Sequence, residues 1–504
     1  MNMTKDKKIK KILLLQPNYA WMTKRTWHFP PYSLCLLKAA VGGLAETVVF
    51  DPNFSNLSEE DVSHVLKEID PDLVGVTSAS TEYLNVSKLL ISVIRKSLPE
   101  ALIVFGGVIP TVLLEEAVKD KNVDYWIVGE GDLSFPRLID ELQKKSPDLS
   151  SVNGLVYRHK GKVVKNENVF LEDLDQIPYP DYSNIIGNRK MDKVSMHDYG
   201  NIPLKYAPHF LARKYPFAMT ITTRGCPFRC IFCAGRTVSG QKVRFRSAEN
   251  VLREIDILYK QGIKEVIFLD DHFLADKKRA MDIMNGIIER KYDLVWRCSN
   301  VTVWLLDKEI LETMYKSGCN FLTVSPESGN QQVLDRIIKK PLKLDKLPQI
   351  LDMAKQIGFG IVVNFIFGFP GETWDQIRDT VRYAESLNVD MVNFHIATPL
   401  PKTELMEICL REKLLPDDYV RNIEKYSGYG KGLITTEEFT PLELEALRSF
   451  EWDRINFASQ ERCRAIMRLN GITANEVETW RVNTRRNLGI NSLIENIMDA
   501  AEKA

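Results

Sequence analysis

The chain has 504 residues, with 67 basic and 67 acidic side chains and a formal net charge of zero. Hydrophobic residues make up 44% and charged residues 27% of the chain, which is ordinary for a folded globular protein. This balance gives no reason to expect a nucleic acid or a charged membrane surface as a partner, and the length predicts roughly two to four domains.

The apolar runs and the cysteines indicate the cellular compartment of the protein. The first apolar run, residues 12–15, is too short for a signal peptide, and no stretch is long enough to cross a bilayer. Eight cysteines, five of them scattered singly, do not suggest a disulfide scaffold in a chain of this size. We therefore expect a cytoplasmic protein with reduced thiols and no membrane partner.

Residues 1–148 alternate short apolar strands with helices. The predicted strands are 12–15, 46–50, 72–76, 101–105 and 123–128, and the clearest helices are 31–41, 58–69 and 84–96. Apolar strands separated by helices indicate a parallel sheet that is covered on both faces. This region is therefore predicted to be a Rossmann-like, doubly wound α/β domain.

Small and polar residues follow several of these strands. Ligands of such sheets bind at the carboxyl ends of the strands, so these residues are candidates for a binding site. They are Ser78, Ser80, Thr81, Gly106, Gly107, Gly129, Glu130 and Gly131.

Residues 149–214 are predicted to be a connector, with a small hairpin around Gly161 and a loop rich in Pro, Asp and Asn at 178–188. Strand and helix signals resume in residues 215–402, with strands at 219–222, 266–269, 294–297, 321–324, 362–367 and 391–396. Six strand–helix units predict a partial (β/α)6 barrel of the TIM type, with its chemistry at the carboxyl ends of the strands.

Residues 403–504 change to a helical pattern. Helices are predicted at 404–413, 441–457, 459–467, 474–488 and 492–503. This region carries no glycine-rich loop and no metal-ligand spacing, so we expect it to cap the barrel and shape a substrate pocket.

Three cysteines, Cys226, Cys230 and Cys233, follow the first predicted barrel strand. Zinc sites generally add a second Cys or His pair, which is missing here. Three thiolates can hold three irons of a [4Fe–4S] cluster and leave the fourth iron open, because a full ligand set needs four. Burial of the three thiols in a core is the alternative, but Gly225 and Pro227 indicate a loop.

This spacing, with Phe232 before the last cysteine, resembles the signature of the radical S-adenosylmethionine (SAM) enzymes. The resemblance implies that the open iron binds the amino and carboxylate groups of SAM. The reduced cluster then cleaves SAM to methionine and a 5′-deoxyadenosyl radical. An electron donor such as flavodoxin or ferredoxin is implied as a partner.

The same resemblance implies SAM contacts at the ends of other barrel strands. A family arginine after the third strand is missing here, or displaced onto Arg297. The adjacent Asp270 and Asp271 are also able to cap a helix, and the Gly368 turn is equally explained by local structure. The implied SAM-binding residues are Phe232, Asp270, Asp271, Arg297, Ser325, Glu327, Ser328 and Gly368. Tyr206, His209 and Trp304 are further pocket candidates without a supporting spacing.

The N-terminal domain resembles the cobalamin-binding domain of one radical SAM subgroup. The resemblance rests on residues 105–111, 128–132 and 177–180. None of the seven histidines lies in an Asp-x-His-x-x-Gly motif, so cobalamin would bind without a protein histidine ligand. A generic nucleotide-binding domain, or a vestigial one, is the alternative.

Together the two resemblances imply a cobalamin-dependent (class B) radical SAM methyltransferase. It would methylate an unactivated carbon, or a phosphorus centre, of a small-molecule or natural-product substrate. A second SAM would restore the methyl group of cobalamin and leave S-adenosylhomocysteine. A cobalamin-dependent radical cyclase or oxidoreductase, or a non-catalytic corrinoid or iron–sulfur binding protein, is the alternative. A methylthiotransferase is disfavoured because no second cysteine triad lies upstream, and the substrate itself stays open.

Overall fold

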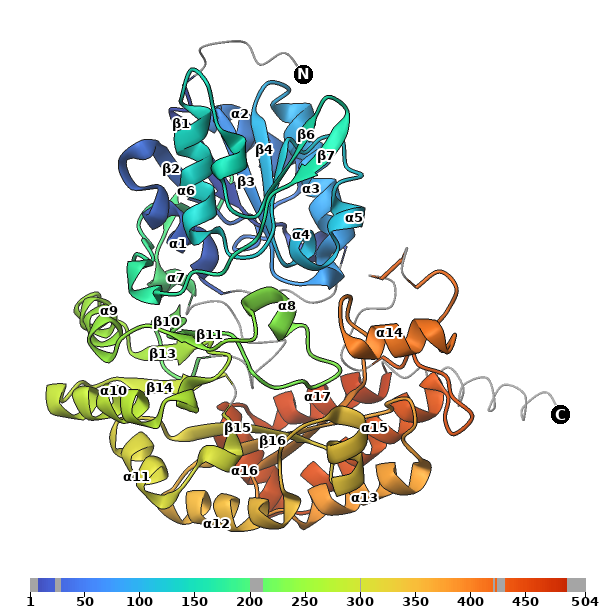
Figure 1. Ribbon diagram of the computed structural model, residues 1–504. Coiled ribbons are helices and arrows are strands. Elements are labelled where there is room, and N and C mark those ends of the chain that lie inside the picture. Colours follow the sequence, from blue (N-terminus) through green and yellow to red (C-terminus); the bar gives the residue numbers. More distant parts are fainter. Residues whose placement is uncertain are drawn as a thin grey trace.

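The computed structural model describes residues 8–22, 29–199, 212–299, 301–419, 422–423 and 431–486. An N-terminal α/β domain lies above a larger barrel domain, and the C-terminal helices wrap around the barrel (Figure 1). The short helix α8 (Gly235–Ser239) lies between the two domains. No helix among the described residues has the length and apolar character that a bilayer crossing requires.

The N-terminal sheet has nine strands in the order β7-β6-β5-β4-β3-β1-β2-β8-β9. Its parallel centre comprises β1 (Lys11–Leu15), β2 (Glu46–Phe50), β3 (Leu73–Ser78), β4 (Leu102–Gly107) and β5 (Tyr125–Ile127). Each lies within two residues or so of its predicted position. Apolar runs between Gly, Pro and Asn residues located them correctly.

Both faces of this sheet are covered, as the sequence predicts. Along β1, Ile12 and Leu14 join the core on one face, and Leu13 and Leu15 join the core on the other. The first face packs against α1 (Tyr32–Val41) and α6 (Gly131–Leu142), and the second against α2 (Glu59–Ile69) and α3 (Leu84–Ser97). Two short helices, α4 (Val108–Val112) and α5 (Leu114–Ala117), follow β4.

The segment predicted as a connector adds strands to both edges of the same sheet. The predicted hairpin forms β6 (Leu155–His159) and β7 (Lys162–Lys165) beside β5. On the opposite edge lie β8 (Ile185–Ile186) and β9 (Lys193–Val194), followed by α7 (Met196–Tyr199). Residues 149–199 are therefore more than a linker.

The six predicted barrel strands are present and parallel, in two sheets of three. One sheet contains β10 (Phe217–Thr220), β13 (Glu265–Phe268) and β14 (Val295–Cys298). The other contains β15 (Phe321–Glu327), β16 (Gly360–Phe367) and β17 (Met391–Ile396). A single bridge between Val301 and Val324 joins them. The outer helices are α9 (Ala248–Lys260), α10 (Lys277–Arg290), α11 (Lys308–Lys316), α12 (Leu347–Ile357) and α13 (Trp374–Ser386).

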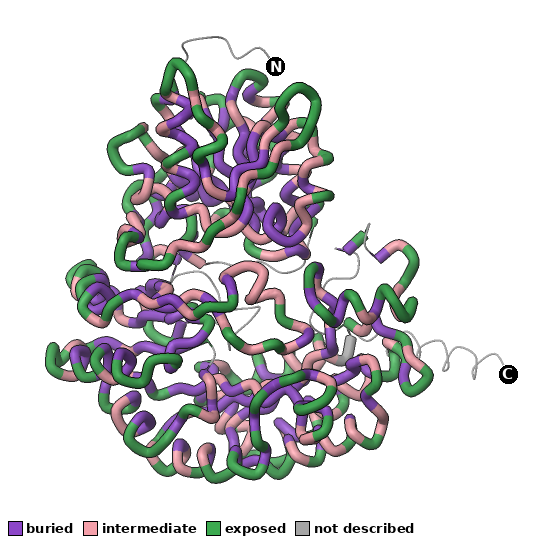
Figure 2. Tube along the Cα trace, in the orientation of Figure 1, coloured by how far each residue is buried: buried purple, intermediate pink, exposed green. Residues whose placement is uncertain are grey.

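The C-terminal helices are α14 (Glu404–Arg411), α15 (Pro441–Asn456), α16 (Gln460–Asn470) and α17 (Ala474–Arg486). Asn456 of α15 accepts a hydrogen bond from Val392 N at 2.8 Å and donates one to Val392 O at 2.7 Å. The helix therefore satisfies the free edge of β17, which would otherwise expose unpaired backbone groups. Figure 2 shows the buried interior of each domain. The helix predicted at 492–503 lies outside the described residues.

Candidate active site

The three cysteines lie on a long loop, residues 225–243, between the two strands of a short ribbon. The ribbon consists of β11 (Thr223–Arg224) and β12 (Arg244–Phe245), and the sequence did not reveal it. Gly225 has a φ of +95°, and a Cβ there would lie 2.2 Å from Lys242 O. Only glycine fits this backbone position, so the residue before Cys226 fixes how the loop leaves the ribbon.

All three thiols are free, with Cys226 and Cys230 half-buried and Cys233 exposed. Burial raises the pKa of the Cys230 thiol to about 12, so binding of a metal must release its proton. Among the described residues, no three His, Cys, Asp or Glu side chains are placed to share one metal ion. A four-iron cluster makes no such demand because each thiolate binds a different iron. The donor set therefore fits a cluster.

The two adjacent aspartates at the end of β13 have different surroundings. Asp270 is buried and accepts a 2.6 Å hydrogen bond from Thr222 N, and burial raises its pKa. Asp271 is exposed, borders a cavity and accepts a 2.9 Å hydrogen bond from Gly225 N. Of the two predicted SAM ligands, Asp271 thus lies beside the cysteine loop, and Asp270 holds β10 and β13 together.

The end of β15 brings Glu327 to Lys340, which the sequence interpretation missed. Lys340 Nζ lies 2.8 Å from a carboxylate oxygen of Glu327 and donates a 2.6 Å hydrogen bond to Ser325 O. Both charged side chains are buried, and Glu327 has a φ of +74°. Burial raises the pKa of Glu327, and the Lys340 ammonium opposes that rise. A carboxylate expected to be buried needs a cation nearby, and this was the signal that could have predicted the pair.

Lys340 also connects to the cysteine loop. Its ammonium lies 5.8 Å from the ring centre of Trp304, and Trp304 packs against Phe228 of the loop at 5.1 Å. Trp304 thus contacts the cysteine loop, whereas Tyr206 and His209 lie outside the described residues. Ser328 is turned to α13, where its hydroxyl lies 3.0 Å from that of Thr380.

The turn after β16 is held by a buried carboxylate. Gly368 has a φ of +88°, and Glu372 accepts hydrogen bonds from Gly368 N at 2.7 Å and from Phe369 N at 3.1 Å. The second carboxylate oxygen of Glu372 has no partner, and burial raises the pKa of this group to about 7. Phe232 of the cysteine loop packs against Phe369 with ring centres 5.9 Å apart. The turn is thus tied to the cysteine loop.

Arg297 lies in the interior of the barrel. Its guanidinium is buried and forms an ion pair with Glu265 at 3.1 Å. Glu265 is the first residue of β13, so the pair lies toward the end of the strands that is remote from the cysteine loop. This pairing favours a structural role for Arg297 over contact with a ligand at the strand tips.

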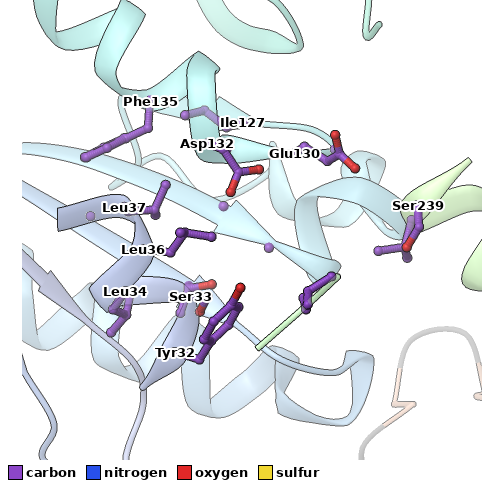
Figure 3. A pocket seen from close by; sticks show the side chains of 18 of the residues that line it. Tyr32, Ser33, Leu34, Leu36, Leu37, Ile127, Glu130, Asp132, Phe135 and Ser239 are labelled. Carbon is purple, nitrogen blue, oxygen red and sulfur yellow. The ribbon is translucent and has the colours of Figure 1, made fainter. Parts of the chain in front are cut away.

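Five of the eight predicted cobalamin residues line a cavity of about 280 Å³ at the carboxyl edge of the N-terminal sheet. Gly106, Gly107, Gly129, Glu130 and Gly131 line it, whereas Ser80 lines a neighbouring cavity. Side chains of α1 and α6 form its apolar wall, and Ser239 of α8 closes it from the barrel side (Figure 3).

The glycines of this edge fall into two groups. A Cβ on Gly107, whose φ is +87°, would lie 2.5 Å from Ser78 O, while a Cβ on Gly106 would meet no atom within 4 Å. Ser78 itself accepts a 3.1 Å hydrogen bond from Ile109 N, and Thr81 is buried. Gly107 therefore shapes the strand tip, and Gly106 leaves open space above it. The edge above Gly106 is therefore open to a ligand.

Two ion pairs join this edge to the base of the cysteine loop. Arg224 forms a two-pronged pair with Asp132, at 2.6 and 3.0 Å, and Arg244 forms one with Glu130, at 2.8 and 2.6 Å. The arginines are register partners in the ribbon, and all four side chains are largely buried. We call them the inter-domain ion pairs. The predicted cobalamin residue Glu130 is thus committed to Arg244 and, at 3.4 Å, also contacts Arg224.

A larger cavity, of about 500 Å³, adjoins the smaller cavity and lies partly inside the barrel. It is lined by residues of β10, β13, β14, β15, β16 and β17, and by Tyr19, Ser80 and Tyr83 of the N-terminal domain. The two cavities share four wall residues, which are Tyr32, Ser33, Ile221 and Leu269. The two cavities therefore adjoin at the domain boundary.

Comparison with known proteins agrees with this geometry. Residues 220–384 match the radical SAM superfamily, and residues 22–139 match the B12 binding domain. An uncharacterized methyltransferase of Pyrococcus horikoshii is 31% identical over 454 residues, which cover 88% of this chain and 93% of the relative. Cytidylyl-2-hydroxyethylphosphonate methyltransferase of Streptomyces wedmorensis is 27% identical over 427 residues, covering 78% and 77%.

A solved structure shares the fold. The radical SAM methyltransferase TsrM from Kitasatospora setae, with cobalamin and a [4Fe-4S] cluster bound, superposes with a TM-score of 0.65 at 19% identity. The match covers 80% of this chain and 78% of TsrM. From the two domain matches, the full-length relative and the donor set, the chain belongs to the cobalamin-dependent radical SAM methyltransferases, with a [4Fe–4S] cluster, SAM and cobalamin as cofactors.

Proposed function

We propose that this enzyme methylates an unactivated carbon centre, or a phosphorus centre, of a small molecule. The observation that carries the proposal is the shared wall of the two cavities, because a methyl donor in one can then face an acceptor in the other. When bound, the reduced cluster supplies the electron that cleaves SAM, and cobalamin supplies the methyl group.

The residues of the chain take distinct roles in this proposal. Cys226, Cys230 and Cys233 hold the cluster, and Cys233 gives it an exposed edge for an electron donor such as a flavodoxin or ferredoxin. Asp271 accepts from the amino group of SAM, because it is the exposed carboxylate beside the loop. Lys340 pairs with Glu327 and bonds to the backbone of Ser325, so that both residues are held in place to face the ribose.

The N-terminal domain holds cobalamin by shape. The residues that would hold cobalamin are Gly106 and its neighbours at the strand tips, with the apolar side chains of α1 and α6 beside them. Among the described residues that line this cavity, none is a histidine. This supports binding without a histidine ligand to cobalt.

The domain limits stay as 1–148, 149–214, 215–402 and 403–504 in this proposal, with the strands of residues 155–194 added to the sheet of the first domain. A cytoplasmic location is supported by the eight free thiols, among which the structure forms no disulfide within its described residues.

The test is product analysis after anaerobic reconstitution with iron, sulfide, SAM and cobalamin. Incubation with candidate acceptors should give 5′-deoxyadenosine and S-adenosylhomocysteine together, with a methylated product, by mass spectrometry. Deoxyadenosine without S-adenosylhomocysteine would instead indicate the cyclase or oxidoreductase reaction. Absence of both would support a non-catalytic binding protein.

A further inference from the structure

We propose that the larger cavity is the substrate chamber, and that it accepts a neutral, mostly apolar molecule carrying one hydrogen-bonding group of the carboxamide type. The proposal rests on the proposed function, because it takes the neighbouring smaller cavity as the cobalamin site. A substrate in this chamber touches the four shared wall residues, so its reacting centre can face the methyl donor.

The entrance and sides of the chamber are apolar and aromatic. Tyr19 and Tyr83 are stacked with ring centres 4.0 Å apart, and Phe29 is a further aromatic residue of the lining. From the barrel, Met219 and Ile267 add aliphatic surface. A volume of about 500 Å³ falls in the range of sites that enclose small organic ligands. The chamber therefore selects mainly for a ligand with a large apolar surface.

The floor carries a row of polar side chains across three adjacent strands. Asn393 of β17 donates to Asn364 of β16 at 3.0 Å, and Asn364 donates to Ser325 of β15 at 3.3 Å. Both asparagines line the chamber. An amide has two donor hydrogens and an acceptor oxygen, so this row retains hydrogen-bonding capacity toward a ligand. A purely apolar ligand would bury that capacity without a partner, which costs free energy.

Charge disfavours an anionic substrate in this chamber, and it therefore favours the carbon centre of the proposed function over a phosphorus centre that carries negative charge. Among the described lining residues, the charged side chains are Glu82 and Arg297. Arg297 already pairs with Glu265, and Glu82 would repel an anion. A buried carboxylate or phosphate without a cationic partner is strongly disfavoured. The row of amides therefore matches a neutral group such as a carboxamide or lactam.

The test uses two probes of equal size, neutral 2-naphthamide and anionic 2-naphthoate. Each is titrated calorimetrically into the full-length protein, loaded with cluster and cobalamin but without reductant, so that no turnover occurs. We expect 2-naphthamide to bind at least about tenfold more tightly than 2-naphthoate. Equal or tighter binding of 2-naphthoate, or binding of neither probe, would overturn the proposal.

Two variants locate the binding. Asn393→Leu should weaken 2-naphthamide about tenfold. The matched control is Asn388→Leu, because Asn388 is exposed and bonds to Asp352 at 3.2 Å; it should change nothing. Ala79→Trp, at an exposed lining position that does not endanger folding, should abolish binding. Unchanged affinity in both chamber variants contradicts the proposal.

The outcome is separable from that of the proposed function. Selective 2-naphthamide binding in a protein that yields neither deoxyadenosine nor S-adenosylhomocysteine leaves the chamber standing and removes the methyltransferase. If the protein forms deoxyadenosine and S-adenosylhomocysteine but binds neither probe, the methyltransferase stands and the chamber proposal is removed.

Discussion

The two edges that face each other across the domain boundary are built by opposite means. The N-terminal edge consists of glycine backbone, such as Gly106 and Gly107, before an apolar wall. The barrel edge consists of thiols and charged side chains, such as Cys230, Asp271 and the Glu327–Lys340 pair. The N-terminal edge thus selects a ligand by shape, and the barrel edge by charge and coordination. Substitutions in the two edges should therefore affect different properties of the protein.

The largest effect is expected on the barrel edge. Cys230→Ala removes one of three cluster ligands, so deoxyadenosine formation should fall by about a thousandfold or more, with loss of bound iron and sulfide. Cobalamin binding should persist because the N-terminal edge is untouched. Cys463→Ala, on α16, is the control and should retain its iron. Full iron content in Cys230→Ala would refute the assignment.

The inter-domain ion pairs come next. Arg244→Met removes the two-pronged partner of Glu130 and leaves it only the longer 3.4 Å contact with Arg224, which should lower the free energy of unfolding by about 3 kcal/mol. Limited proteolysis should also cut more readily between the domains. Lys242→Met is the matched control on the same loop, because its pair with Glu172 is exposed and should contribute little. Equal effects of the two substitutions would remove the special role of the buried pairs.

Glu372 predicts a pH dependence of stability. Burial raises its native pKa from 4.5 to about 7, so the native protein holds this proton more tightly than the unfolded chain. The tighter proton binding stabilises the native state below pH 4.5. As the pH rises through 7, the free energy of unfolding should fall by roughly 3 kcal/mol. Denaturant unfolding at pH 5 and pH 8 should show this loss, and Glu372→Gln should abolish it. An unchanged difference in the variant contradicts the assignment.

The smallest effect separates two neighbouring glycines. Gly107→Ala should lower the free energy of unfolding by about 1–3 kcal/mol, because of its positive φ and the clash with Ser78 O. Gly106→Ala should leave stability nearly unchanged but weaken cobalamin binding, because the new methyl group enters open space in the cavity. Spectroscopic cobalamin titration with parallel unfolding distinguishes them. Equal stability of both variants would show that the strand tip tolerates the change.

Sequence reasoning located most of the fold because its signals are local. The central strands, such as β1 and β16, are apolar runs between turn residues, and the cysteine triad is defined by spacing alone. The ribbon β11–β12 was missed because its two-residue strands are too short to show a period.

The rest depends on contacts between distant residues. Nothing local says that Arg224 meets Asp132, or that Lys340 meets Glu327. The sequence also does not indicate that Asp270, and not the adjacent Asp271, is the buried carboxylate. Burial is set by how β13 packs against β10, and this emerges only in three dimensions.

The central claim is that the cluster on the cysteine loop and cobalamin in the smaller cavity lie close together at the domain boundary, because Asp271 both borders that cavity and bonds to Gly225 of the loop. Electron paramagnetic resonance of the protein with cob(II)alamin and the reduced cluster tests it most directly. The account predicts that each paramagnet broadens and speeds the relaxation of the other, and that Cys230→Ala restores the isolated cob(II)alamin signal. Two signals that simply superpose, with unaltered relaxation, would contradict it.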